Sequence, residues 1–170
     1  MQITPTNNEK IFKDNLLLVT KTDLKGHITY ANRAFIDIVE MSEDTLIGAP
    51  HKIIRHPDTP KIIFKYLWNY IQSGKEIHAY VKNICADGSY YWVIANVTPS
   101  FDSTSASTNN IIGFHSARRT PTPEAMAIIK PLYETLLRAE KSAGITASEK
   151  VMNDLLQEKG VSYDEFILSF

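Results

Sequence analysis

The chain has 170 residues, of which 44% are hydrophobic and 22% charged, and its formal net charge is −1. This size and composition are typical of a soluble protein with one domain, or with one domain and an appendage. The balanced charge gives no indication of a nucleic-acid partner or of binding to an anionic membrane. The single cysteine, Cys85, excludes an intrachain disulfide bond and a metal cluster held by several cysteines.

Polar residues dominate the N-terminal segment, MQITPTNNEKIFKDN, which is unlike a signal peptide. No apolar run in the sequence approaches the roughly 18 residues of a membrane-spanning helix. We therefore expect a cytoplasmic protein without membrane insertion. Because the sequence starts with methionine, we also expect a complete small protein. Residues 1–15 form the expected N-terminal lead, of which residues 1–12 are expected to be mobile.

The first half of the chain alternates between short strand and helix patterns. Apolar and β-branched residues predict strands at Leu16–Thr22 and His27–Tyr30, joined by a turn. Asn32 is expected to cap a helix with one apolar face. Ser42 is expected to start a second short helix, which Gly48 ends.

The second half begins with strand patterns and ends with helical ones. Three strands are predicted at Ile77–Cys85, Tyr90–Pro99 and Ile111–Arg119, and the hairpin sequence ADGS joins the first two. The polar stretch Asp102–Asn110 is expected to be a mobile loop. The predicted helical segments that follow are an exposed helix at Ala125–Ser142 with a kink at Pro131, then Ser148–Lys159 and Tyr163–Phe170.

The order of these elements predicts an α+β domain with a five-stranded, mostly antiparallel sheet. The helices between the second and third strands should cover one face of the sheet and leave a cleft against it. We expect the domain at residues 16–120 and a helical extension at residues 121–170. The apolar residues of the extension need a cover, so we expect them to contribute to an intermolecular surface and the chain to form a homodimer.

Chemistry-bearing residues concentrate between Gly48 and Asn69, where the sequence reads GAPHKIIRHPDTPKIIFKYLWN. Cationic and hydrogen-bonding groups stand here beside the aromatic residues Phe64 and Trp68. This combination suits a flat ligand with an anionic tail. It also suits a polar loop in front of a buried helix, which Asp58 would cap and Gly74 would end.

Catalytic motifs are absent from the sequence. It contains no GxGxxG, P-loop or HExxH motif and no nucleophile elbow, so we expect no enzyme. A metal site would have to draw on scattered histidines, and we expect none, because His51 and His56 are five residues apart in an irregular segment. A haem with His56 or His78 as axial ligand remains an alternative, although no c-type attachment motif is present.

Three segments carry a family resemblance: GAPHKIIRHPDTPKIIFKYLW, VKNICADGSYYWVIANVTP and IIGFHSARR. With them the chain resembles PAS sensory domains, in particular the FAD-binding PAS domains of bacterial aerotaxis sensors, over Leu16–Leu137. The resemblance implies a five-stranded antiparallel sheet, helices over one face, and FAD held noncovalently between them. It implies a redox or energy sensor that passes the flavin state to a signalling protein such as a chemoreceptor-type transducer.

The resemblance also implies which residues bind the cofactor. The set consists of Asn32, Arg55, His56, Asp58, Phe64, Trp68 and Asn83. A cation offsets the pyrophosphate, an aromatic side chain packs on the flavin ring, and an amide meets the donors and acceptors of the ring edge. The alternatives are a cofactor-free PAS module for protein interaction or dimerisation, and a haem-binding PAS sensor. Unlike the related LOV photosensors, the chain has no cysteine in its helix loop.

Overall fold

The computed structural model describes residues 3–102 and 110–170. Its strands are β1 (Leu18–Thr22), β2 (Ile28–Ala31), β3 (Ile77–Ile84), β4 (Tyr90–Phe101) and β5 (Ile111–Arg119). Its helices are α1 (Arg33–Val39), α2 (Glu43–Leu46), α3 (Lys61–Gln72), α4 (Pro123–Ala143), α5 (Ile145–Lys159) and α6 (Tyr163–Ile167), with a 3-10 turn η1 (His51–Ile54). Apart from its two ends, the predicted loop Asp102–Asn110 lies outside the described residues.

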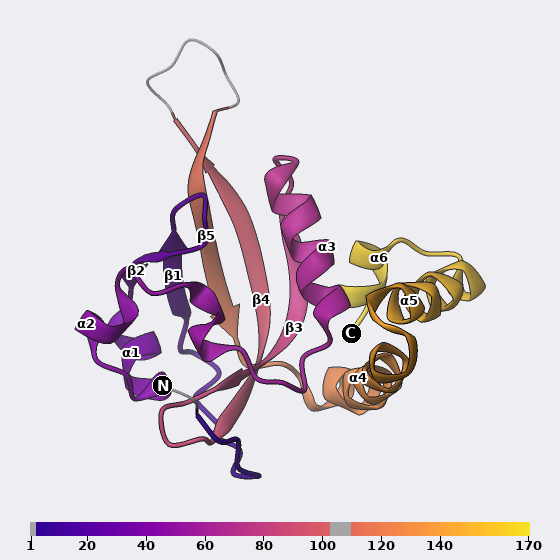
Figure 1. Ribbon diagram of the computed structural model, residues 1–170, viewed down its shortest axis with the longest axis horizontal. Coiled ribbons are helices and arrows are strands. Elements are labelled where there is room, and N and C mark those ends of the chain that lie inside the picture. The colour runs from indigo at the N-terminus through magenta and orange to yellow at the C-terminus, as the bar shows by residue number, and fades with distance from the viewer. Residues whose placement is uncertain (1–2, 103–109) are drawn as a thin grey trace.

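The strands form one antiparallel sheet in the order β2-β1-β5-β4-β3. The predicted fold class, α+β with a five-stranded antiparallel sheet, is therefore confirmed. Figure 1 shows α1 and α2 near the β1–β2 edge of the sheet and α4–α6 grouped on the side of β3. The two hairpins that were expected from turn chemistry, β1–β2 and β3–β4, both form.

Side chains of β4 alternate between two buried faces of the sheet. Ala95 and Val97 lie on the inner face, which η1 and α3 cover. Trp92 lies on the outer face, where its ring centroid is 5.8 Å from that of Tyr133 in α4. Both faces of this strand are apolar because helices cover both.

The start of α3 differs from the prediction, because Asp58 does not cap it. Pro60 precedes the helix and has no side-chain donor or acceptor for this purpose. The carboxylate of Glu140 in α4 accepts hydrogen bonds from the amides of Lys61 and Ile62, at 3.1 and 3.0 Å. Ser148 of α5 donates its hydroxyl to the same carboxylate at 3.1 Å. A single side chain thus joins the N-terminus of α3 to α4 and α5.

Replacing Glu140 with alanine should lower the free energy of unfolding by about 1–2 kcal/mol, because two amides of α3 lose their acceptor. Urea denaturation followed by circular dichroism measures this change. The matched control is Glu134→Ala, which removes a carboxylate from an exposed position of the same helix. Equal losses in the two variants would contradict the role of Glu140.

The C-terminal helices are less exposed than the sequence predicts. Helix α4 buries four side chains, Ala125, Ile129, Tyr133 and Leu136. Its Tyr133 hydroxyl donates a hydrogen bond to the carbonyl oxygen of Tyr80 in β3 at 2.5 Å. The prediction of an exposed helix is therefore wrong, because the aromatic outer face of β3 and β4 provides a cover for this apolar stripe.

Helix α6 also packs on the chain itself. It buries Tyr163, Phe166 and Ile167 and contacts the edge strand β3. The rings of Tyr163 and Tyr66 of α3 lie 5.2 Å apart. The three buried side chains of α6 therefore have an intramolecular cover, whereas Ile128, Ile145 and Leu168 stay exposed. The intermolecular surface expected for the extension stays a prediction.

The described part of the N-terminal lead, for which a mobile segment was expected, makes main-chain hydrogen bonds to the sheet. It runs along the start of β4, where Tyr90 donates its amide to Asn8 and accepts from Lys10, at 2.9 and 2.7 Å. The amide of Thr6 donates to Gly88 at 2.8 Å. A β-carbon at Gly88 would overlap the carbonyl oxygen of Thr4, so a glycine is needed at this crossing.

Candidate functional site

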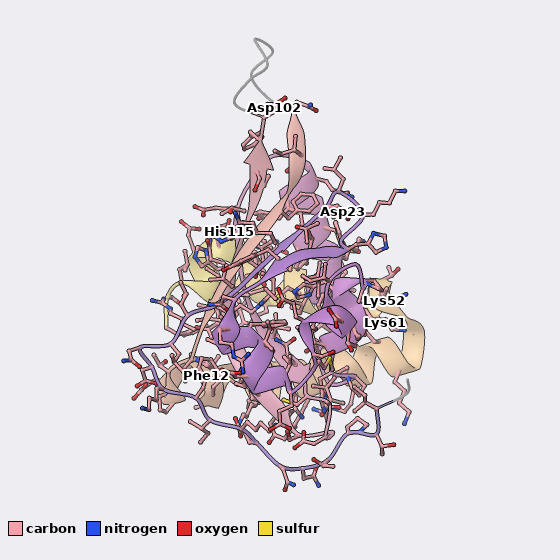
Figure 2. The ribbon with its side chains drawn as sticks, turned by 90° about the vertical axis from the view of Figure 1, so that its left-hand side faces the viewer. Phe12, Asp23, Lys52, Lys61, Asp102 and His115 are labelled. Carbon is pink, nitrogen blue, oxygen red and sulfur yellow. The ribbon has the colours of Figure 1, made fainter. Side chains whose placement is uncertain are left out.

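A cavity of about 210 Å³ lies between the inner face of the sheet and the segment from η1 to α3. Figure 2 shows two borders of this region, the β1–β2 turn with Asp23 and the η1 segment with Lys52, on the same side of the molecule. The amide of His51 joins them through a hydrogen bond to the carbonyl oxygen of Gly26 at 2.8 Å. The lining side chains that matter below are Thr20, Lys25, His51, Lys52, Arg55, Phe64, Leu67, Trp68, Ile71, Asn83, Phe114, Ser116 and Arg118.

One face of α3 forms an apolar wall of the cavity. Phe64, Leu67, Trp68 and Ile71 recur at helical spacing and all line it. The ring of Trp68 stands edge-to-face against Phe114 of β5, with centroids 5.7 Å apart and an interplanar angle of 87°. This contact fixes the orientation of the indole at the cavity wall.

Arg55 lines the cavity and is exposed to solvent. Its guanidinium carbon is 3.5 Å from the centroid of the Phe64 ring, a cation–π contact. Partial burial lowers the pKa of Arg55 from its ordinary value, but the group remains a cation at neutral pH. The main chain of Arg55 also forms a β-bridge with Asn83 of β3. The stack and the bridge position this cation in the cavity lining.

Arg118 of β5 provides a second cation, which is only 3% exposed. Its Nη2 donates hydrogen bonds to the hydroxyl of Thr20 at 2.7 Å and to Nε2 of His51 at 2.6 Å. Its Nη1 has no hydrogen-bond partner among the described residues. Burial lowers the pKa of Arg118 to about 10, so the guanidinium is charged at neutral pH.

His51 does not add charge to this end of the cavity. A guanidinium can only donate hydrogen bonds, so Nε2 of His51 must accept, which requires the neutral ring. Burial, then the charges of Arg118 and Arg55, hold the pKa of His51 well below its ordinary value. The imidazole therefore orients Arg118 as a neutral acceptor.

Three buried polar groups of the lining lack hydrogen-bond partners within the described chain. They are Asn83 Nδ2, Ser116 Oγ and Arg118 Nη1, which come from β3 and β5. A buried donor without a partner costs about 1–3 kcal/mol. A ligand with several acceptor atoms would remove this cost, so the inner end of the cavity suits such a ligand.

The charged groups of the lining are all cations. Lys25 and Lys52 join Arg55 and Arg118 there, and no aspartate or glutamate occurs among the described residues that line the cavity. Neither lysine forms an ion pair with a described residue. Cations without counter-charges beside an aromatic wall favour an anionic ligand with a flat apolar part.

Four of the seven residues expected to bind a cofactor line this cavity: Arg55, Phe64, Trp68 and Asn83. Asn32 does not. Its Oδ1 accepts hydrogen bonds from the amides of Val19 and Phe35, both at 3.0 Å, and its Nδ2 donates to Leu17 at 2.8 Å. These bonds give Asn32 a structural role, as the cap of α1 and a tie to β1.

His56 and Asp58 also lie outside the cavity lining. The amide of His56 donates to the carbonyl oxygen of Lys82 at 3.3 Å, and Asp58 forms an ion pair with Nζ of Lys82 at 2.7 Å. Thr59 adds a further bond to Lys82, at 2.9 Å. The RHPD segment thus fastens the connection between η1 and α3 to strand β3, and only its arginine reaches the cavity.

Sequence reasoning missed Arg118, Ser116 and Thr20 as parts of the site. The available signal was the period of two in β5, where Phe114, Ser116 and Arg118 share a face. The direction of that face depends on the pairing of β5 with β1 and β4, which the local sequence does not contain.

The histidines considered for haem are placed unfavourably. Neither His56 nor His78 lines the cavity, and Nε2 of His78 lies 3.1 Å from the side-chain amide of Asn96. Among the described residues, no three side chains that ligate metals are grouped together. The described helices also include none that is long and apolar enough to cross a membrane.

The structure thus has a sheet of five antiparallel strands and, between this sheet and the segment from η1 to α3, a cavity lined by cations. Residues 28–115, more than half of the chain, match the family described as PAS fold, and the chain belongs to this family. Its sequence is 35% identical to the aerotaxis receptor of Escherichia coli (strain K12) over 147 residues, which is 86% of this chain and 27% of that receptor.

More distant relatives are also regulatory proteins. The chain is 28% identical to the bacterioopsin transcriptional activator of Halobacterium salinarum over 93 residues, which is 55% of this chain and 14% of the activator. It thus spans about a quarter or less of these relatives. The solved structure of the blue-light photoreceptor Aureochrome1 LOV shares the fold, with a TM-score of 0.58 and 21% identity over 65% of this chain and 86% of that one.

Proposed function

We propose that this chain binds FAD noncovalently in the cavity and acts as a redox or energy sensor in the cytoplasm, without turnover. The observation that carries the proposal is a cavity with an aromatic wall, four cations and no carboxylate among its described lining residues. Phe64 and Trp68 would contact the flavin ring, and Asn83 would hydrogen-bond to its edge. Lys25, Lys52 and Arg55 would neutralise the phosphates.

The relatives support a sensory role. A segment similar in sequence to this chain occurs within a protein named as an aerotaxis receptor. The fold is shared with a Light-Oxygen-Voltage domain whose structure was solved in a study of a flavin analogue. A bound flavin would supply a reversible redox centre. This chain's own residues would exclude water from the ring, orient it and place cations near it. We further propose that a signalling partner, or a second copy of this chain in a homodimer, reads the resulting change.

Light-driven chemistry at a cysteine is not part of this proposal. Cys85 lies just beyond β3 and does not line the cavity. It is fully buried, and burial raises the pKa of its thiol, so the reactive thiolate is disfavoured.

The cofactor proposal predicts that the purified protein is yellow and carries FAD. The absorption spectrum is recorded first, and the cofactor is then released by heat and identified by chromatography. FAD at near-full occupancy, directly or after reconstitution, supports the proposal. FMN or haem at comparable occupancy, or no cofactor after reconstitution with FAD, would overturn it, and the last outcome would favour an interaction module.

A further inference from the structure

Arg118 is a buried cation with no anionic partner among the described residues. It is 3% exposed, and within the described part of the chain its side chain donates hydrogen bonds to the hydroxyl of Thr20 and the imidazole of His51. No described carboxylate lies within ion-pair distance of it. Burial of an uncompensated charge is costly, and removal of one partner from a buried pair is strongly destabilising. A bound anionic ligand would therefore have to supply the compensating negative charge.

The other titratable groups near Arg118 do not neutralise it. They are His51 of η1, Tyr91 of β4 and His115 of β5. Burial raises the pKa of Tyr91 far above neutral, so this hydroxyl stays protonated. Burial lowers the pKa of both histidines, so they stay neutral. Of these four groups, only Arg118 is therefore charged at neutral pH.

The ring of an oxidised flavin is neutral. When an external reductant supplies two electrons and solvent supplies one proton, the ring carries one negative charge. A second proton would cancel that charge. A fixed cation stabilises the singly protonated form and disfavours uptake of the second proton. The positive charge of Arg118 would thus be fully neutralised only when the flavin is reduced.

We propose that Arg118 makes the cavity bind the reduced, anionic form of its flavin more tightly than the neutral oxidised form. This inference rests on the proposed flavin binding and adds to it the residue that sets the redox preference. Thr20 and His51 act as positioning residues, because their acceptor atoms fix Nη2 and leave Nη1 available. Each tenfold preference for the reduced form raises the two-electron midpoint potential by about 30 mV.

The test compares the wild-type protein with Arg118→Gln, each loaded with FAD and titrated with dithionite. The glutamine keeps a hydrogen-bond donor and removes the charge. We expect the preference for reduced FAD to fall about tenfold, which is about 30 mV in midpoint potential. Arg118→Lys should retain most of the preference. The matched control is Arg119→Gln, which removes the exposed neighbouring cation and should leave the potential unchanged.

The affinity for oxidised FAD separates this role from phosphate recognition. The charge of the pyrophosphate does not change on reduction. If Arg118 instead binds the phosphates, the glutamine variant should lose affinity for oxidised and reduced FAD equally and keep the wild-type midpoint potential. That result would show that the inference is wrong. If the wild-type protein binds no FAD, the proposed function itself fails. These two failures are therefore distinguishable.

A measurement on the wild-type protein keeps the inference testable should Arg118→Gln not fold. On the acidic side, where free reduced flavin takes up two protons, the bound couple should take up one proton per two electrons. Its midpoint potential should then change by about 30 mV per pH unit. A slope twice as steep would show that the bound reduced ring is neutral and would overturn the role of Arg118.

Discussion

Replacing Gly113 with alanine is expected to lower the free energy of unfolding by about 2–3 kcal/mol. Gly113 is a buried residue of β5, next to the pairing of Phe114 with Thr22 of β1. An added β-carbon would overlap the carbonyl oxygen of Thr22. Because main-chain atoms cannot rotate away as a side chain can, β1 would have to move from β5. Thr22 and Phe114 both line the cavity, so ligand affinity should fall as well.

The matched control for this prediction is Gly160→Ala. Gly160 has φ 66° and ψ 31°, and a β-carbon there would meet no atom within 4 Å. Its replacement should cost about 1 kcal/mol, from the left-handed backbone alone. Urea denaturation measures the free energy of unfolding of both variants. The difference between their losses gives the cost of the steric overlap at Gly113 beyond that of backbone strain. A loss at Gly113 no larger than that at Gly160 would contradict the close approach of β1 and β5.

Much of the fold follows from local sequence patterns. The hairpin turn ADGS and the strand patterns on either side of it indicate two paired strands, and β3 and β4 pair as expected. Asn32 and Ser42 are found at the predicted helix starts, where each side chain accepts from a helix amide. Such signals succeed because both partners lie within a few residues of each other.

Features that depend on distant partners could not be predicted in this way. Asp58 is a plausible cap for α3, but the acceptor that occupies the helix start is Glu140, more than 70 residues further along the chain. The N-terminal lead pairs with β4 through main-chain atoms, which leave no side-chain pattern. Helix α4 shows an apolar stripe, yet its sequence does not reveal that Tyr80 and Trp92 cover it.

The candidate site also combines features that local sequence predicts with features that depend on distant partners. The aromatic wall of α3 was predictable, because helical spacing places Phe64 and Trp68 on one face. The buried cation was not, because the adjacent residues Arg118 and Arg119 look equivalent in the sequence. Only the strand register, with Arg118 opposite Leu18 and Ala95, determines which of the two lies inside. Of the RHPD segment, Arg55 lines the cavity, whereas His56 and Asp58 contact Lys82 of β3.

Replacing Trp68 with alanine should weaken flavin binding about 10- to 100-fold, which corresponds to about 1.4–2.8 kcal/mol. The indole stands edge-to-face against Phe114 and closes the cavity over Gly26, where an added β-carbon would lie 3.1 Å from its ring. Its removal takes away a large apolar contact surface and opens the wall to water. Titration of the apoprotein with FAD, followed by flavin fluorescence, measures the loss.

The control for Trp68 lies on the same helix and faces the other way. The ring of Tyr70 is 6.5 Å from that of Tyr163 in α6, and Tyr70 does not line the cavity. Tyr70→Ala should therefore lower stability through its lost packing on α6 but keep FAD affinity within about twofold of wild type. If both variants lost FAD equally, the effect would come from a loosened α3, and the cavity wall would not be the binding surface. If Trp68→Ala alone kept wild-type affinity, the flavin would have to bind elsewhere on the protein.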